Sequence, residues 1–223
     1  MDHLDVVGVS DRARCFYRRV ELVTWITTGC GCDLDVRSTK PMFVEGKVMI
    51  LRLVRPEQKY ADQVMQYKKE MADNNDIFSG CAGLEDVDTF SEWMDFEKRL
   101  RQKYGEGYVP SEVFLAVLMN DDKVVGIIDY RHPLTPFLLQ YAGNIGYSIL
   151  PSERRKGYAS EMLRLLLQIC ISYGEKRVLL TCDKDNEASR RTIIKNGGAL
   201  ENEIIDDVGL GRCGIIQRYW ISL

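Results

Sequence analysis

Residues 144–168 read NIGYSILPSERRKGYASEMLRLLLQ, and this stretch passes from a strand pattern to a helix pattern within a few residues. Its first part alternates large and small side chains as far as Ile149, which is typical of a strand. Pro151 then lacks a backbone donor, so it ends the hydrogen-bond ladder. Apolar residues follow at helical spacing from Met162 to Cys170. The stretch therefore predicts a strand that leads through a short turn into a helix packed on a sheet.

The turn, residues 154–159, reads RRKGYA and combines basic with small residues. Gly157 and Ala159 would let a ligand approach the main chain closely. The first turn of the following helix has N–H groups without intrahelical partners, and the positive end of the helix dipole lies behind them. These features predict an anion site suited to phosphate or pyrophosphate. The alternative is an ordinary solvated turn; the spacing matches neither a P-loop nor a dinucleotide-binding Gly-x-Gly-x-x-Gly turn.

The turn resembles the acyl-CoA signature of the GNAT superfamily of N-acetyltransferases, Arg/Gln-x-x-Gly-x-Gly/Ala. Here the signature reads Arg154-x-x-Gly157-x-Ala159, and a strand ends just before it at Ile149. A second landmark is Asn186-x-x-Ser189 at the start of a helix, where the family has an Asn-x-x-Ala/Ser segment that contacts the pantetheine arm. Asn186 is also suited simply to capping that helix. The chain is thus similar to acyl-CoA-dependent N-acetyltransferases, in a bacterial-type branch.

The segments around these landmarks follow the order that the resemblance implies. Helical spacing and apolar runs predict strands and helices from residue 48 to the C-terminus, with Ser91 as an early cap of the second helix. The expected strands are 48–54, 113–119, 124–130, 145–149, 177–182, 200–205 and 215–221, and the expected helices are 57–74, 89–104, 158–170 and 185–195. The expected fold class is therefore α/β, a GNAT fold whose mixed, mostly antiparallel central sheet has helices on both faces.

Residues 1–47 form an N-terminal extension that does not continue this pattern. The segment has two apolar patches and a Gly/Cys/Asp-rich run, and no steady period joins them. We expect it to be poorly ordered or outside the core, because Met49 opens the first regular strand and the segment reads like a tail. A non-native upstream reading and a partner-binding arm are the alternatives. The second unit, residues 48–223, is the predicted N-acetyltransferase domain.

Composition narrows the class of protein. The 223 residues suit one domain with an extension, and 45% apolar with 28% charged residues is ordinary for a globular protein. A net charge of −3 without a basic, aromatic-laced stripe argues against nucleic-acid binding. We expect no membrane partner, because no apolar run is long enough to span a bilayer. The N-terminus also lacks the pattern of a secretory signal.

The cysteines indicate a reducing compartment. Seven scattered cysteines are an odd number, which suits free thiols in the cytoplasm better than a disulfide framework. Cys30 and Cys32 form the only close pair. A zinc site would need a second pair of cysteines or a pair of histidines, and the histidines are only His3 and His132. We therefore expect a cytoplasmic protein without a metal.

The resemblance implies acetyl-CoA as co-substrate and a direct transfer to an amine. In the family the central strand splays from its neighbour, so that backbone groups are free to pair with the pantetheine. The main-chain N–H of Ile149 is the candidate to polarise the thioester carbonyl and to hold the oxyanion. No covalent enzyme intermediate is required, because holding both reactants side by side supplies much of the acceleration. The residues expected to contact CoA are Ser148, Ile149, Leu150, Arg154, Arg155, Lys156, Gly157, Tyr158, Ala159, Ser160, Asn186 and Ser189.

One position departs from the family. Many members have a tyrosine seven residues after the Asn as general acid towards the departing thiolate, and here that position is Ile193. Tyr147, on the central strand, is the candidate we place beside Ile149 in the catalytic site, although it can equally pack or bind a ligand. Asp129, His132 and Cys182 remain open as acid, base or substrate contacts. The acceptor or solvent can also carry the proton.

The acceptor is chosen in this family by the segment between the first two helices and by the last hairpin. Glu85, Asp86 and Asp88 in the first of these segments would attract a cationic amine, unless they are simply solvated. We expect a primary amine acceptor, a small molecule first and a protein N-terminus or lysine as the alternative. The alternative from another functional class is a catalytically idle CoA-binding module. Whether the protein forms a homodimer is left open.

Overall fold

The computed structural model describes residues 25–26, 35–37, 42–44, 47–102, 109–210 and 214–223. The strands within this part of the chain form two main antiparallel sheets and one hairpin. The strands are β1 (Trp25–Ile26), β2 (Asp35–Arg37), β3 (Met42–Val44), β4 (Lys47–Met49), β5 (Leu51–Val54), β6 (Ser111–Leu118), β7 (Lys123–Arg131), β8 (Ile145–Ile149), β9 (Arg177–Asp183), β10 (Ala199–Ile205) and β11 (Ile215–Ser222). The larger sheet has the order β1-β2-β5-β6-β7-β8, the smaller has the order β10-β11-β9, and β3 pairs with β4.

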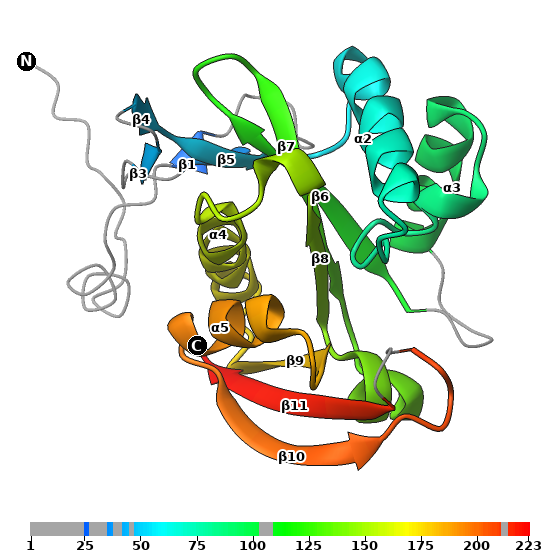
Figure 1. Ribbon diagram of the computed structural model, residues 1–223, viewed down its shortest axis with the longest axis vertical. Helices are drawn as coiled ribbons and strands as arrows, with labels where there is room; N and C mark the ends of the chain where they lie inside the picture. Colours follow the sequence, from blue (N-terminus) through cyan, green and yellow to red (C-terminus); the bar gives the residue numbers. More distant parts are fainter. Residues whose placement is uncertain (1–24, 27–34, 38–41, 45–46, 103–108, 211–213) are drawn as a thin grey trace, which may run out of the picture.

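Helices cover both faces of the larger sheet. They are α2 (Ala61–Asp73), α3 (Phe90–Gln102), α4 (Tyr158–Ser172) and α5 (Glu187–Lys195), with short 3-10 turns at Gln58–Tyr60, Leu84–Asp86 and Pro151–Glu153. Helices α2 and α3 lie on one face and α4 lies on the other, and α5 packs against α4 and the smaller sheet (Figure 1). Two buried clusters fill the space between these layers, one beneath α4 and one beneath α2 and α3.

Local chemistry explains where the helices begin and end. Helix α3 begins with a capping box, because the Glu92 N–H donates to Thr89 Oγ1 at 3.2 Å and Glu92 Oε2 accepts from the Thr89 N–H at 3.1 Å. The expectation that Ser91 caps this helix is therefore wrong, and Thr89 takes that role. Helix α4 has an apolar side without Gly or Pro, and its end is marked by Gly174 at φ +87°.

The expected arrangement of one α/β unit with helices on both faces is confirmed, with one difference in the sheet. Every strand pairing within the described residues is antiparallel, and β8 and β9 belong to different sheets. Where β9 comes nearest to β8, the Asn144 N–H donates to Leu179 O at 2.7 Å and the Leu179 N–H donates to Asn144 Oδ1 at 2.8 Å. A side chain thus takes the place of a ladder, and the two strands separate beyond it.

Two further elements were not expected from the sequence. The loop after β7 contains a π-helical turn, Leu138–Ala142, closed by the Gly143 N–H donating to Leu138 O at 2.7 Å. Short pieces of the N-terminal extension form strands, and β2 pairs with β5 through Val36 opposite Leu53. The larger part of residues 1–47 lies outside the described residues, so the role of the extension stays a prediction.

Candidate functional site

The turn after β8 ends at the N-terminus of α4, which no side chain caps. Gly157 precedes the helix with φ +84°, a left-handed conformation that favours glycine. A Cβ built on Gly157 would meet nothing within 4 Å, so the space in front of the helix is open. The first-turn amides, among them those of Ala159 and Ser160, and the helix dipole therefore favour an anion there.

The three basic residues of the turn have different surroundings. Arg154 is engaged twice, by Asp76 Oδ2 at 2.9 Å and by donation from Nε to Ile149 O at 3.1 Å. Lys156 pairs with Glu153 Oε2 at 3.0 Å. Arg155 is exposed, and its side chain has no hydrogen bond or ion pair with any part of the chain that the structure describes. Arg155 is therefore the cation that is available to an anion in front of α4.

Strand β8 has one paired edge and one open edge beyond Asn144. The Leu150 N–H donates to Val125 O at 3.0 Å and the Arg131 N–H donates to Asn144 O at 2.7 Å, so the even-numbered residues of β8 face β7. By the same alternation, the main-chain N–H groups of Tyr147 and Ile149 point to the open edge. This corrects the expectation for the main chain of Ser148 and Leu150, whose groups pair with β7, and leaves Ile149 with a free N–H.

The side chain of Tyr147 crosses from β8 to the first turn of α5. Its hydroxyl lies 2.9 Å from Ser189 Oγ, and burial, which outweighs the hydrogen bond from Ser189, raises the Tyr147 pKa well above its usual range. The hydroxyl is therefore protonated at neutral pH and can act as a donor. Asn186 caps α5, because its Oδ1 accepts from the Ser189 N–H at 3.0 Å. The structure thus brings Tyr147, Asn186 and Ser189 together at the open edge.

Position 193 offers no proton carrier, and the remaining candidates for acid or base are less well placed. Ile193 is fully buried and contributes only packing. Burial raises the pKa of the Cys182 thiol to about 11, so this thiol is protonated and unreactive at neutral pH. Asp129 is 5% exposed and its carboxylate already accepts from Arg131 and from the Gly146 N–H, which leaves little room for a role as base.

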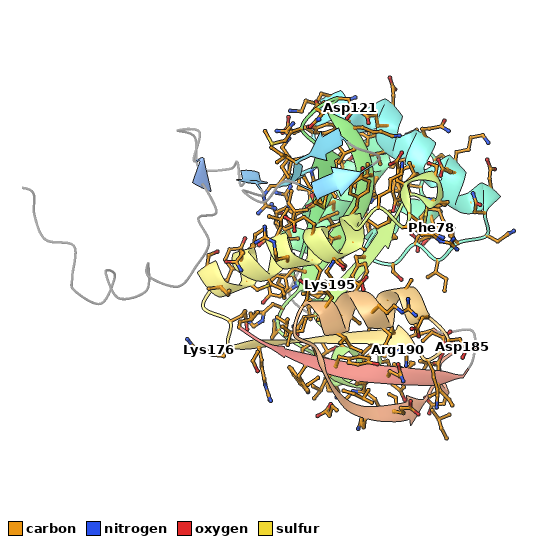
Figure 2. The ribbon with its side chains drawn as sticks, turned by 60° about the vertical axis from the view of Figure 1, so that its left-hand side comes forward. Phe78, Asp121, Lys176, Asp185, Arg190 and Lys195 are labelled. Carbon is orange, nitrogen blue, oxygen red and sulfur yellow. The ribbon has the colours of Figure 1, made fainter. Side chains whose placement is uncertain are left out.

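The loop between α2 and α3 packs its first part against β8. Ser148 Oγ donates to Ser79 O at 2.9 Å and accepts from the Tyr67 hydroxyl at 2.9 Å. A Cβ on Gly80 would lie 2.3 Å from Gly146 O, so only glycine permits this contact. Figure 2 shows Phe78 of this loop and Asp185, which precedes α5, towards the same side of the molecule.

Two acidic residues of this loop line a groove with α3. Asp86 and Asp88 line a shallow groove of about 590 Å³ together with residues of α3. Glu85 is exposed, although partial desolvation of its carboxyl raises its pKa. The groove is therefore a feature of α3 and the end of the loop, while the contact of the loop with β8 is made by Ser79, Gly80 and Cys81, whose Sγ lies 3.2 Å from Ser148 Oγ.

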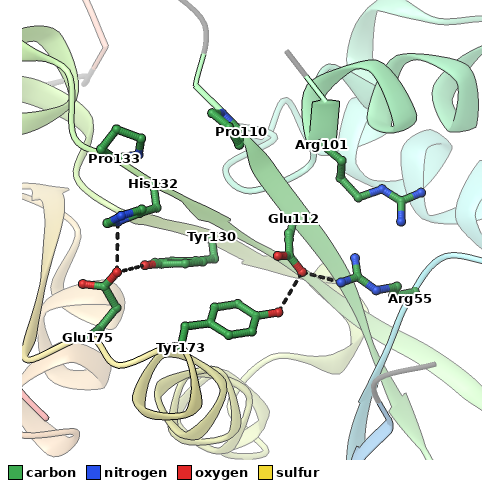
Figure 3. Close-up of a pocket in the computed structure, with 9 residues that line it drawn as sticks. All are labelled: Arg55, Arg101, Pro110, Glu112, Tyr130, His132, Pro133, Tyr173 and Glu175. Carbon is green, nitrogen blue, oxygen red and sulfur yellow. Dashed lines mark hydrogen bonds and ion pairs between the residues drawn. The ribbon is translucent and has the colours of Figure 1, made fainter. Parts of the chain in front are cut away.

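His132 pairs with Glu175, just past the C-terminal end of α4, and so lies at the opposite end of this helix from the anion site. Figure 3 shows the surroundings of His132. His132 lines a cavity of about 460 Å³ in which Glu175 Oε1 accepts from the Tyr130 hydroxyl at 2.8 Å and lies 3.0 Å from His132 Nδ1. Across the cavity, Glu112 accepts from the Tyr173 hydroxyl at 3.0 Å. The structure therefore does not bring His132 to the open edge of β8.

One polar pair near the site was missed by sequence reasoning. Asp129 and Arg131 are two residues apart on β7, so their side chains leave the same face of the strand. Arg131 Nε lies 2.8 Å from Asp129 Oδ2, and Nη2 lies 2.9 Å from Oδ1. An Asp-x-Arg spacing on a buried strand was the signal that would have found this pair.

Among the described residues, no cluster of His, Cys, Asp or Glu is arranged to hold a metal.

Comparison with protein families gives one match. The model of the acetyltransferase (GNAT) domain matches residues 51–199, which is more than half of the chain. A comparison with curated protein sequences finds no match. The matched residues include both the turn before α4 and the first turn of α5.

Solved structures share the fold at low sequence identity. The microcin C7 self-immunity acetyltransferase MccE, in complex with acetyl-CoA and AMP, is 19% identical with a TM-score of 0.58, over 78% of this chain and 92% of that chain. RimL, a ribosomal L7/L12 alpha-N-protein acetyltransferase in complex with CoA, is 19% identical with a TM-score of 0.59, over 82% and 98%. RimJ of Mycobacterium smegmatis, in complex with CoA-disulfide, is 18% identical with a TM-score of 0.59, over 82% and 86%.

Proposed function

Because the chain belongs to the GNAT acetyltransferase family, whose members use acetyl-CoA as co-substrate, we propose that it transfers the acetyl group to a primary amine. The observation that carries this proposal is the continuity of two features. The open edge of β8 at Ile149 leads directly into the turn that ends at the uncapped N-terminus of α4. A pantetheine needs the first feature and a pyrophosphate needs the second.

The residues present fit acetyl-CoA. The open space at Gly157 and the amides of Ala159 and Ser160 would hold the pyrophosphate. Arg155 would add a charge to the phosphates, while Arg154 and Lys156 hold the turn in shape through their ion pairs with Asp76 and Glu153. When bound, acetyl-CoA supplies the activated acetyl group. The residues of the chain bind the co-substrate and orient its thioester.

Two groups of the chain are placed to assist the transfer. The Ile149 N–H would donate to the thioester carbonyl oxygen, where negative charge develops as the amine attacks. The hydrogen-bonded hydroxyls of Tyr147 and Ser189 would deliver a proton to the departing thiolate. They would thus replace the tyrosine that is frequent in the family at the position where this chain has Ile193.

A small molecule is the first candidate acceptor, and a peptide N-terminus is the second. RimL is named as an alpha-N-protein acetyltransferase of a ribosomal protein, which is the reason to keep the peptide candidate. We also propose a cytoplasmic location, which the free thiols of Cys81, Cys170 and Cys182 support. No helix in the described part of the chain is long and apolar enough to cross a membrane.

The test is a thermal melt with acetyl-CoA, with CoA and ATP as comparisons. At a hundredfold excess over Kd, binding stabilises the native state by about 2.7 kcal/mol. In a protein of this size the melting temperature then rises by about 5–10 °C. A rise with acetyl-CoA and CoA but not with ATP, followed by thiol release in the presence of amines, supports the proposal. Binding without thiol release for any amine would favour the idle CoA-binding module.

A further inference from the structure

We infer that Arg131 selects the acceptor, by binding a carboxylate that the acceptor carries close to its amine. This inference rests on the proposed function, since it concerns the second substrate of the same site. It commits the acceptor to one chemical class: a free amino acid, or a peptide whose N-terminal residue is acidic. The shared chemistry of the two sources is a primary amine with a carboxylate a few bonds away.

The guanidinium of Arg131 is held in a fixed orientation but is only partly used. Asp129 takes one N–H from Nε and one from Nη2, at 2.8 and 2.9 Å. A guanidinium has five N–H donors, and the others have no partner among the described residues. Burial opposes the charge, but Asp129 outweighs this effect, so the pKa of Arg131 is raised and the cation is permanent. The side chain is 20% exposed, so a ligand can reach it.

The guanidinium lies over β8 on the side of the α2–α3 loop. A Cβ on Gly146 would lie 2.2 Å from Arg131 Nη2 and 2.9 Å from the Gly80 N atom. The absence of a side chain on Gly146 therefore leaves the space that the guanidinium occupies. Asp129 itself is anchored by the Gly146 N–H at 2.9 Å, which fixes the pair to β8.

The position along β8 places Arg131 on the acceptor side of the reacting group. The phosphates of the proposed co-substrate lie beyond the C-terminal end of β8, and the thioester lies at Ile149. The acceptor must therefore approach from the other direction, towards Gly146. Three residues of a strand span about 10 Å, so Gly146 and the guanidinium above it lie about that far from the Ile149 N–H.

This separation suits a carboxylate-bearing amine. A guanidinium binds a carboxylate through two parallel hydrogen bonds, and this contact together with a few covalent bonds bridges about 10 Å. An amine without an anionic group leaves the remaining donors of Arg131 without an acceptor once the acceptor displaces water. The acidic residues at the end of the loop, Asp86 and Asp88, line a groove with α3 and do not face this position. The site therefore favours anionic over cationic acceptors.

The experiment compares amines that differ only in the carboxylate. Acetyl-CoA-dependent thiol release is measured with phenylalanine against phenethylamine, and with the peptide amide Asp-Ala-Phe against Asn-Ala-Phe. For the native protein we expect kcat/KM to favour the carboxylate-bearing member by about 10- to 100-fold. Preference within only the first or only the second pair identifies the source of the carboxylate, a free amino acid or a peptide.

Variants of Arg131 decide whether this residue is the cause. Arg131→Gln should reduce the preference to within about twofold, and Arg131→Lys, which keeps the charge without the fork, should give an intermediate value. The matched control is Arg99→Gln, because Arg99 lies over the ring of Phe96 on α3 and should not affect the preference. The rise in melting temperature with acetyl-CoA should persist in every variant and reports a folded co-substrate site. If Arg131→Gln does not fold, the Lys variant decides the matter.

Any other result of these assays contradicts either the inference about Arg131 or the proposed function. Turnover without a preference, or a preference that survives in Arg131→Gln, overturns the inference and leaves the acetyltransferase intact. Acetyl-CoA binding without turnover of any carboxylate-bearing amine also overturns the inference, with the co-substrate site retained. If acetyl-CoA neither binds nor is consumed, the proposed function fails and the inference fails with it.

Discussion

Replacing Gly157 by Asp should abolish acetyl-CoA binding without unfolding the domain. The new carboxylate would stand directly before the first amides of α4, in the open space where the proposed pyrophosphate lies. It would repel the phosphates and interact with the same helix N-terminus. Because nothing lies within 4 Å of the added Cβ, the substitution creates no steric clash in the protein itself.

The cost in stability comes from the backbone and can be measured separately. Gly157 has φ +84°, and a residue with a Cβ in the left-handed region costs about 1–2 kcal/mol, less for Asp and Asn than for most others. This cost corresponds to a fall in melting temperature of about 2–8 °C. Gly157→Asn has the same shape without the charge. Gly174→Asn is the matched backbone control, because Gly174 has φ +87°, equally open surroundings, and a position at the other end of α4.

The assay is the melting temperature of each variant with and without acetyl-CoA. Native protein and Gly174→Asn should show the full rise of about 5–10 °C, since linkage gives about 2.7 kcal/mol at a hundredfold excess over Kd. Gly157→Asp should show no rise, and Gly157→Asn should keep part of it. An undiminished rise in Gly157→Asp would falsify the assignment of the anion site to this turn.

Three further predictions concern proton transfer, a buried charge and the extension. Tyr147→Phe should lower kcat by about 10- to 100-fold with little change in acetyl-CoA affinity, because the hydroxyl beside Ser189 is proposed to act on the leaving thiolate. Steady-state kinetics check this, and Tyr130→Phe, which removes a similar tyrosine hydrogen bond in the distant cavity, should leave kcat unchanged. Glu97→Gln should raise stability at pH 7, because burial outweighs the ion pair with Arg101 at 2.9 Å and raises the pKa of this 1% exposed carboxyl above its value in the unfolded chain. Because the folded-state pKa of Glu97 is raised, the native protein loses stability as pH rises above about 4.3. Denaturant titrations should therefore find no gain in stability from Glu97→Gln below about pH 4. A gain that persists there contradicts the reasoning. Deleting residues 1–47 should leave a folded domain that still binds acetyl-CoA, with a melting temperature a few degrees lower because β5 loses its partner β2. Loss of the cooperative transition in that deletion would show instead that the core depends on the extension.

Sequence reasoning was sufficient wherever neighbours in the chain determine the structure. The strand, turn and helix around Gly157 are encoded by alternation, a helical period and a small residue, all of which are local signals. The first turn of α5 is similar, because the Asn186 side chain caps the amide of Ser189 three residues later. The family match over residues 51–199 is consistent with these local signals.

The sequence could not assign roles among residues that look alike. The signature begins at Arg154, but the pattern does not tell which of Arg154, Arg155 and Lys156 is available to an anion. Only contacts with the distant Asp76 and the nearby Glu153 distinguish the engaged cations from the available one. Likewise, the register between β7 and β8 decides that the free N–H belongs to Ile149 and not to Leu150. Partners far apart in the sequence, such as Tyr147 and Ser189, are set by packing and leave no local signal.

The division of the sheet explains why the proposed active site lies at β8. If β9 paired with β8 along its whole length, the Ile149 N–H would be consumed by a ladder and could not serve a ligand. The Asn144 side chain ends the contact by pairing with Leu179, and the Tyr147 hydroxyl then reaches Ser189 across the widening gap. Asn144→Ala should therefore weaken acetyl-CoA binding as well as stability, because it removes the side-chain acceptor of the Leu179 N–H and the side-chain donor to Arg131 O, and leaves only the backbone bond to Leu179 O where the two strands part.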